Sequence, residues 1–266
     1  MSFLTPLVAS LVSGLYTSLW GAFKDCPYEG FKPRTFPRSV YFNLAAFLLL
    51  YYTPAFRHEF RGLGVAQIFF VVMGIERALA ELYKGFFRRE DQAKYFVPTR
   101  MTFFGRYVAS DLLLSVCGTV AVVAVFALTM IDLRAEPFFV FLVTAYATGL
   151  VVALGGAYKD APFEGFKWLK FQRSAVVLAL LSPLFYFLNK PNAPVPLSFL
   201  IYMNIGLERF AVEYYKTYIQ RTMSGKFKPD LPRDQQQIAA REKFHYAALV
   251  IIAAVILVYI YEVRAL

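Results

Sequence analysis

Cysteine and histidine are scarce in this chain of 266 residues, which has two of each. Cys26 and Cys117 are too few for a disulfide framework, and neither stands in a spacing typical of metal or redox sites. Two histidines supply too few ligands for a zinc or haem site to be expected. The sequence also lacks a glycine-rich nucleotide-binding loop, a Ser-His-Asp spacing and an Asp-rich motif of the kind that binds prenyl diphosphates. These absences argue against the corresponding classes of enzyme.

Charged residues are also few, at 17% of the chain, whereas apolar residues make up 58% and aromatic residues 18%. The mean hydropathy is +0.49, and this combination exceeds what an ordinary soluble domain shows. A helix needs roughly 20 residues to cross a hydrocarbon core of ~30 Å. Eight apolar segments are long enough or nearly so, at about 4–23, 39–56, 67–87, 109–131, 138–158, 174–189, 198–219 and 246–263. The sequence therefore predicts an all-α integral membrane protein with about eight transmembrane helices.

The first apolar segment is expected to be a membrane helix rather than a signal peptide. Residues 1–5 hold no Lys or Arg, the apolar run extends to Phe23, and no convincing small-residue cleavage site follows it. The second and sixth segments are shorter than the rest, which predicts little tilt or a locally thinner bilayer.

Two motifs occur twice in the sequence. At an offset of 135, GAFKDCPYEGFK at 21–32 aligns with GAYKDAPFEGFK at 156–167. At an offset of 132, GIER at 74–77 aligns with GLER at 206–209. Two motifs in the same order, at nearly the same separation, indicate an internal duplication.

The duplication predicts two tandem four-helix repeats, at 1–132 and 133–266. Because each repeat would contain an even number of spans, both repeats should have the same orientation. A pseudo-twofold axis along the membrane normal would then relate them.

The distribution of Lys and Arg gives the expected orientation, because cytoplasmic loops retain positive charge. The loops after the first and third predicted spans are rich in basic residues, and so are their counterparts in the second repeat. The opposite loops keep Arg57, Arg61, Arg134 and Lys190, with Arg264 near the C-terminal end. Both termini are therefore predicted outside, with the charged motif loops in the cytoplasm. This bias and attraction to anionic headgroups explain the net charge of +10 without a nucleic acid partner.

The candidate substrate-binding residues are the charged residues of these motifs in both repeats. They are Lys24, Asp25, Glu29, Lys32, Arg38, Glu76, Arg77, Glu81, Lys84, Lys159, Asp160, Glu164, Lys167, Arg173, Glu208, Arg209, Glu213 and Lys216. They are expected to converge on one cytoplasmic site or to frame two equivalent ones. Cations and carboxylates together suit a phosphorylated or zwitterionic ligand, with or without Mg²⁺ held by the loop acids.

Two carboxylates, Glu76 and Glu208, are predicted near the middle of their spans. Because an unpaired charge is costly there, each must meet a partner across helices, coordinate a cation or stay protonated. One interpretation makes them coupling groups. The alternative is a cross-helix ion pair with Lys24, Lys159 or an arginine that serves helix association alone.

The residues that follow Glu76 are expected to neutralise one another. Arg77, Glu81 and Lys84 have an i, i+4, i+7 spacing, which places a carboxylate between two cations on one helix face. Arg209, Glu213 and Lys216 repeat this triad in the second half.

The two motif loops combine helix breakers with charges. Pro27 and Pro162 are expected to stop the preceding helices, while Gly30 and Gly165 permit a positive φ. The pattern predicts a folded, re-entrant interfacial loop. The alternative is a set of headgroup-facing anchors that pin the loop to the bilayer surface.

Three classes of function fit these features. The leading hypothesis is a transporter or flippase-like carrier for an anionic, phosphorylated or lipidic substrate, since two repeats of the same orientation with intramembrane acids suit such a carrier. The second is an interfacial enzyme that modifies lipid phosphates, with Mg²⁺ bound by the loop acids. The third is an ion channel or a structural membrane subunit whose charges serve assembly.

Overall fold

The computed structural model describes residues 3–130, 133–190, 194–221 and 226–265, and most of these are helical. The α-helices are α1 (Leu4–Glu29), α2 (Arg38–Tyr52), α3 (Pro54–Gly62), α4 (Val65–Leu82), α5 (Asp111–Thr129), α6 (Phe138–Glu164), α7 (Trp168–Leu181), α8 (Pro183–Tyr186), α9 (Leu197–Glu208), α10 (Gln235–Ala240) and α11 (Glu242–Ala265). The π-helices are η1 (Tyr83–Phe87), η2 (Arg209–Glu213) and η3 (Tyr215–Ile219). Two short antiparallel pairs join β1 (Thr102–Phe103) to β2 (Arg106–Tyr107) and β3 (Arg134–Ala135) to β4 (Val195–Pro196).

Four helical segments are long and apolar enough to cross a membrane, namely α1, α5, α6 and the segment from α10 through α11. Helices α2 and α3 pass the same test as a pair bent by 103°, so the described residues hold four or five candidate spans. The prediction of a helical membrane protein is thereby confirmed. Eight full spans are not seen in the described residues, because α7 and α9 have only 14 and 12 residues and α4 carries several charges.

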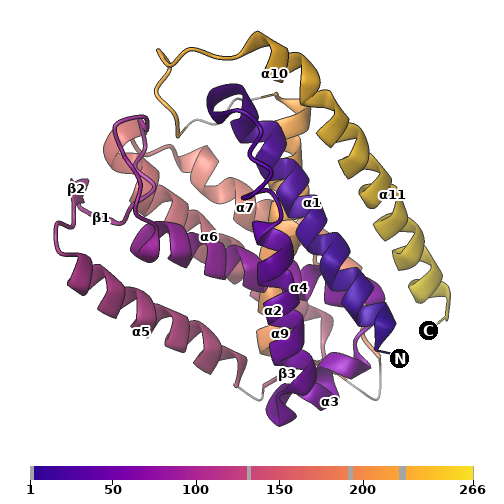
Figure 1. The fold of residues 1–266 in the computed structure, drawn as a ribbon. Coiled ribbons are helices and arrows are strands. Elements are labelled where there is room, and N and C mark those ends of the chain that lie inside the picture. Colours follow the sequence, from indigo (N-terminus) through magenta and orange to yellow (C-terminus); the bar gives the residue numbers. More distant parts are fainter. Residues whose placement is uncertain (1–2, 131–132, 191–193, 222–225, 266) are drawn as a thin grey trace.

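Helices α4 and α9 pack against each other at the centre of the molecule, with α1 against α4 and α6 against α9 (Figure 1). Gly74 in α4 and Gly206 in α9 make this close approach possible. A Cβ atom on Gly74 would overlap the carbonyl oxygen of Tyr202, and one on Gly206 would overlap that of Phe70. Small residues commonly allow helices to pack closely in membranes.

The helical structure of α4 and α9 continues into π-helices. Helix α4 runs on through η1, and α9 runs on through η2 and η3. The segments η1 and η3 lie 132 residues apart, the offset that also aligns the GIER and GLER motifs. Both helices therefore change geometry close to their charged motifs. Because π-helical turns are frequent at functional sites, this change marks the region as a candidate site.

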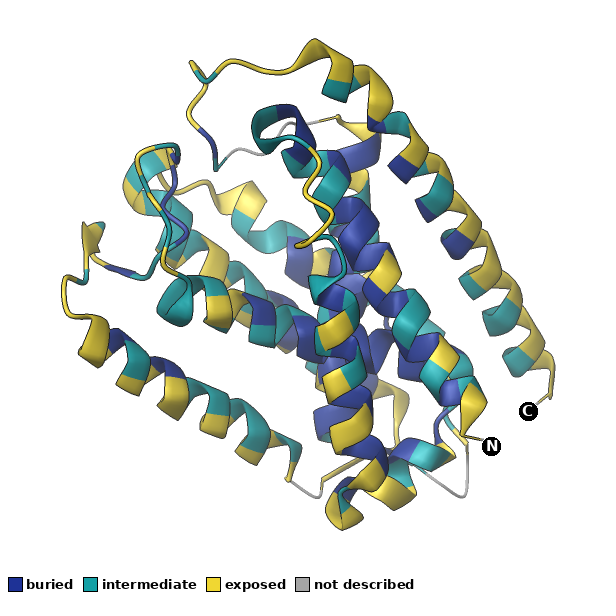
Figure 2. Cartoon of the chain, viewed as in Figure 1, coloured by how far each residue is buried: buried dark blue, intermediate teal, exposed yellow. Residues whose placement is uncertain are grey.

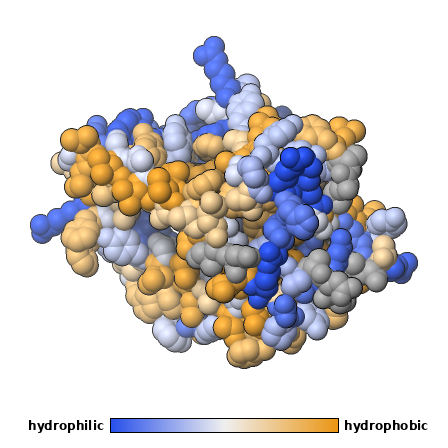
Figure 3. Space-filling model, turned by 90° about the horizontal axis from the view of Figure 1, so that it is seen from below, coloured by the Kyte–Doolittle hydropathy of each residue, from blue (hydrophilic) through white to orange (hydrophobic). Residues whose placement is uncertain are grey.

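The most exposed helices are also among the most apolar. Most residues of helices α5 and α11 are exposed or half-buried, whereas most of the fully buried residues belong to the helices between them (Figure 2). Hydrophobic as well as hydrophilic side chains reach the surface on the face seen from below (Figure 3). Lipid would cover apolar helix faces of this kind without the cost of exposing them to water.

Candidate anion-binding site

The first repeated motif lies at the end of a helix. Helix α1 continues through Pro27 as far as Glu29, and α6 continues through Pro162 as far as Glu164. The prediction that these prolines stop their helices is wrong, because each helix runs two residues beyond its proline.

Glycine ends both helices instead. Gly30 and Gly165 have φ values of 70° and 76°, as expected from their freedom to adopt positive φ. Their N–H groups donate to the carbonyl oxygens of Cys26 and Ala161, at 2.9 and 3.0 Å. The motif acids and lysines therefore project from the ends of two helices rather than from a re-entrant loop.

The second motif forms ion pairs between α4 and the α9–η2 helix. Glu76 in α4 pairs with Arg209, the first residue of η2, and accepts a hydrogen bond from the Ser39 hydroxyl at 2.7 Å. Both charged side chains are almost completely buried, with 1% of Glu76 and 3% of Arg209 exposed. A buried charge is tolerated when it is paired and hydrogen-bonded in this way.

In a second ion pair, the acid comes from α9 and the arginine from α4. Glu208 in α9 pairs with Arg77 in α4 and accepts a hydrogen bond from the Ser174 hydroxyl at 2.8 Å. Each of these two buried carboxylates thus has an arginine partner on the facing helix, one of the arrangements that the sequence left open.

The expected triads form only in part. Lys84 donates to Glu81 and Lys216 donates to Glu213, each at 2.8 Å. Arg77, however, reaches the facing helix instead of completing its own triad, and Arg209 does the same. The prediction of two self-contained triads is therefore wrong, because the buried glutamates attract both arginines.

Three neighbouring cavities surround these ion pairs, and their volumes are about 370, 450 and 110 Å³. We call them the first side cavity (370 Å³), the central cavity (450 Å³) and the second side cavity (110 Å³). Lys24 and Lys84 line both the first side cavity and the central one. Arg173 and Lys216 line both the second side cavity and the central one. Shared lining residues make the three a connected system.

All of the candidate residues from the sequence line this system. The first side cavity is lined by Lys24, Asp25, Glu29, Lys32, Arg38, Glu76, Lys84 and Arg209. The second is lined by Arg77, Asp160, Lys167, Arg173, Glu208, Glu213 and Lys216. The central cavity adds Glu81, Lys159 and Glu164.

The central cavity has an excess of positive charge. Nine basic side chains and four acidic ones line it. Three of the basic residues, Arg77, Arg209 and Lys226, already pair with acids outside this lining, and the remaining six still outnumber the four acids. Such an excess favours the binding of an anion, and lysine and arginine bind phosphate oxygens through charge-assisted hydrogen bonds.

Comparison with known proteins identified no relative of this chain. No family model, curated protein or solved structure matches this chain. The charges and volumes of the cavities are therefore what indicates a function.

A cap formed by two loop segments, 88–97 and 226–228, lies over the end of α1. Lys94 contacts Glu29 at 2.7 Å, and Lys226 contacts Asp25 at 3.1 Å. The N–H of Phe96 donates to the carbonyl oxygen of Lys226 at 2.7 Å, which ties the two segments together. The acids of the first motif are thus held by lysines of the cap.

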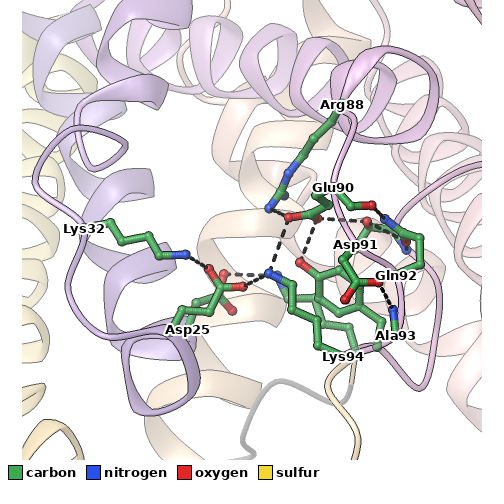
Figure 4. A network of polar contacts seen from close by, with 12 residues as sticks. Asp25, Lys32, Arg88, Glu90, Asp91, Gln92, Ala93 and Lys94 are labelled. Carbon is green, nitrogen blue, oxygen red and sulfur yellow. Dashed lines mark hydrogen bonds and ion pairs between the residues drawn. The ribbon is translucent and has the colours of Figure 1, made fainter.

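The charges within the cap also stabilise one another (Figure 4). Burial alone would raise the pKa of Glu90, but a hydrogen bond from Tyr95 and the charges of Arg88 and Lys94 lower it overall. Burial likewise opposes the charge of Lys94, yet Glu29 and Glu90 raise its pKa. The first segment of the cap is therefore held by charged hydrogen bonds.

The acids of the second motif have a different partner. Lys170 contacts Glu164 at 2.7 Å and Asp160 at 3.7 Å. In the part of the chain that the structure describes, no group of three or more His, Cys, Asp and Glu side chains is placed to hold a metal ion. The loop acids fit lysine partners better than the Mg²⁺ site considered from the sequence.

Several residues that line the cavities or hold their acids were not predicted as site residues from the sequence. Ser39 and Ser174 could have been found, since they align at the offset of 135 beside the repeated basic residues. Lys94 and Lys226 could also have been found, since they align at the offset of 132. Lys170 carries no repeat signal, and only the folded arrangement brings it to the acids of the second motif.

Proposed function

We propose that this protein is a membrane carrier that moves an anionic, phosphorylated amphiphile between leaflets. The observation that carries the proposal is the central cavity of about 450 Å³ with its excess of basic side chains. A phosphoryl group binds well in such a cavity, because its oxygens accept charge-assisted hydrogen bonds from lysine and arginine.

The proposal includes two tandem repeats of the same orientation, at 1–132 and 133–266, whose eight apolar segments all lie in the membrane. Matched contacts support it. Gly14 of α1 lies against Val40 of α2, and Gly149 of α6 lies against Ala175 of α7, with both partners offset by 135. Two such units can rock against each other around a site at their interface.

A lipidic substrate is favoured by a difference between α1 and α6. Helix α11 lies along α1, where Trp20 is buried. The equivalent position in α6 is Gly155, and no described atom lies within 4 Å of a Cβ built on it. Beside it, Val151 and Leu154 are 70% and 62% exposed. An acyl chain could lie against this apolar face while its headgroup occupies the cavity.

Contacts at the opposite end of the molecule suit a closed outer side. Arg134 makes a bidentate contact with Glu59, at 2.7 and 2.9 Å. Glu262 of α11 accepts hydrogen bonds from the N–H groups of Val65 and Ala66 at the start of α4. A carrier in this state would be open only to the side on which the basic motifs lie.

We also propose that Glu76 and Glu208 act as coupling groups. Protonation of Glu76 would leave Arg209 without its partner, and the packing of α4 against α9 would then change. In vesicles with a pH gradient, Glu76→Gln should abolish the effect of the gradient on transport. A variant that keeps the gradient effect would remove the coupling role.

Both termini are proposed to lie outside, with the motif ends of α1 and α6 in the cytoplasm. Single cysteines at His58 and Asp230, in a background without Cys26 and Cys117, test this orientation. A membrane-impermeant maleimide applied to intact cells should label His58→Cys and spare Asp230→Cys, because these exposed residues would lie on opposite sides. The reverse pattern would invert the topology.

Transport is tested with purified protein in phosphatidylcholine vesicles that contain a fluorescent short-chain phosphatidic acid. Dithionite quenches only the outer leaflet, so active carrier should expose almost all of the label. The double variant Lys24→Gln with Lys159→Gln should slow this exchange about tenfold or more, since hydrogen bonds to charged groups contribute roughly 1.5–3 kcal/mol.

Lys228→Gln is the matched control, because Lys228 is exposed and lies outside the three cavities. It should exchange the lipid as fast as the unmodified protein. If phosphatidic acid crosses no faster than in protein-free vesicles, the carrier proposal fails.

A further inference from the structure

We infer that the two side cavities each bind one phosphoryl group, so that the site holds two such groups at once. This inference rests on the proposed function, because it names the number and position of the anionic groups that the carrier takes. Its basis is a pair of arginines, Arg38 and Arg173, which occupy equivalent positions at the offset of 135.

Arg38 lines the first side cavity and lacks an acidic partner among the described residues. Its Nε atom is buried and has no hydrogen-bond acceptor there. Arg38 immediately precedes Ser39, whose hydroxyl is already used by Glu76. A buried guanidinium donor without an acceptor is costly, and an anion in the cavity would supply that acceptor.

Two further polar groups of the first side cavity are unused. The hydroxyl oxygens of Thr17 and Ser18 are buried, and neither has a hydrogen-bond partner in the part of the chain that the structure describes. Both residues are more than nine-tenths buried, with 4% and 6% exposed, and both line the cavity. Hydroxyl donors beside an arginine suit the oxygens of a phosphoryl group.

Arg173 lines the second side cavity as Arg38 lines the first, although Val152 and Ala153 stand there in place of Thr17 and Ser18. Its Nε atom is buried without an acceptor among the described residues, and its neighbour Ser174 is used by Glu208. Lys167 adds a second cation to the lining. The volume of about 110 Å³ exceeds the ~15 Å³ that one water molecule needs, which leaves room for a small anionic group.

The acids near these arginines are already neutralised. Glu76 and Glu208 pair with Arg209 and Arg77, so neither is available to balance Arg38 or Arg173. Each side cavity therefore retains one arginine that no described acid neutralises, and an external anion would balance its charge. Arginine is suited to this role, because its planar fork matches the geometry of phosphate oxygens.

The central cavity connects the two subsites. It shares Lys84 with the first side cavity and Lys216 with the second, and these lysines are equivalent at the offset of 132. Two phosphoryl groups can come from two monophosphorylated lipids or from one lipid that carries both. The chemistry at each arginine is the same in either case.

Native mass spectrometry of the full chain in micelles tests the inference with dioctanoyl phosphatidic acid as the probe. Two molecules should bind to each unmodified chain. Arg38→Gln and Arg173→Gln should each bind one, and the double variant should bind none. One molecule on the unmodified chain, or two on either single variant, would overturn the inference.

Arg106→Gln is the matched control, because Arg106 is exposed and lies outside the cavities, and it should keep both molecules. Arg38→Lys and Arg173→Lys guard against misfolding. Each should keep the thermal transition of the unmodified protein and recover part of the lost binding. Loss of binding equal to that of the glutamine variant, with an unchanged transition, would count against an anion held by a cation at these two positions.

A short-chain diphosphatidylglycerol separates the two sources of phosphoryl groups. If one ligand supplies both, one molecule should bind per chain and displace both molecules of phosphatidic acid. If two ligands are needed, two molecules should bind. If two molecules of phosphatidic acid bind but none is transported, the carrier proposal fails and the two subsites remain. If phosphatidic acid is transported while only one molecule of it binds, the two subsites fail and the carrier proposal remains.

Discussion

Arg209→Gln is expected to destabilise the protein by about 3–5 kcal/mol, the usual cost of removing one partner of a buried ion pair. Only 3% of the Arg209 side chain and 1% of Glu76 are exposed, so the glutamate would be left buried without its partner charge. Chemical unfolding in mixed micelles measures the loss. A change below about 1 kcal/mol, the range of exposed pairs, would show that the pair is not buried as described.

The double variant Glu76→Gln with Arg209→Gln separates the pair from the fold. Because no charge is left unpaired, it should recover most of the stability lost in either single variant. Arg221→Gln provides the control, since Arg221 contacts Glu242 at 3.0 Å while 57% of its side chain is exposed. That substitution should cost at most about 1 kcal/mol.

Gly74→Val is expected to separate α4 from α9 and to destabilise the protein by about 3 kcal/mol or more, at or above the usual cost of overpacking. The added side chain would overlap the carbonyl oxygen of Tyr202, a backbone atom that cannot move away without moving α9. The two ion pairs cross the same interface and would be displaced with it. Thermal unfolding in detergent and the exchange of phosphatidic acid both measure the effect.

Gly155→Ala is the matched control for Gly74, since Gly155 also lies inside a long helix but no described atom comes within 4 Å of its added Cβ. Alanine favours a helix by about 1 kcal/mol over glycine, so this variant should be as stable as the unmodified protein or more stable. Equal losses at both positions would contradict the close packing of α4 and α9.

The sequence predicted the helical membrane fold because length and apolar composition determine which segments can enter lipid. It did not predict where α1 and α6 end. Proline usually breaks a helix, but both helices run two residues past Pro27 and Pro162 and end where Gly30 and Gly165 adopt positive φ.

The candidate site was predicted less completely. The repeat indicated the charged residues, since equivalent acids and bases occur in both halves. Their pairing depends on how α4 meets α9, which is a long-range contact that helical periodicity within one segment does not contain. Glu76 therefore found its partner in Arg209, 133 residues away. The cap lysines, Lys94 and Lys226, align at the offset of 132, but they lie in irregular segments, where no helical periodicity predicts which acids they contact.

Binding of an anionic phosphorylated ligand by the basic cavities is the central claim, and the most direct test is mass spectrometry of lipids and small molecules bound to gently extracted protein. Unmodified protein would be compared with Lys24→Ala and Lys159→Ala, which change residues that line the central cavity. We expect an anionic lipid or phosphorylated compound that binds the unmodified protein specifically and is depleted in both variants. A protein that carries no such compound, or one whose bound compound is unaffected by both lysines, would contradict the claim.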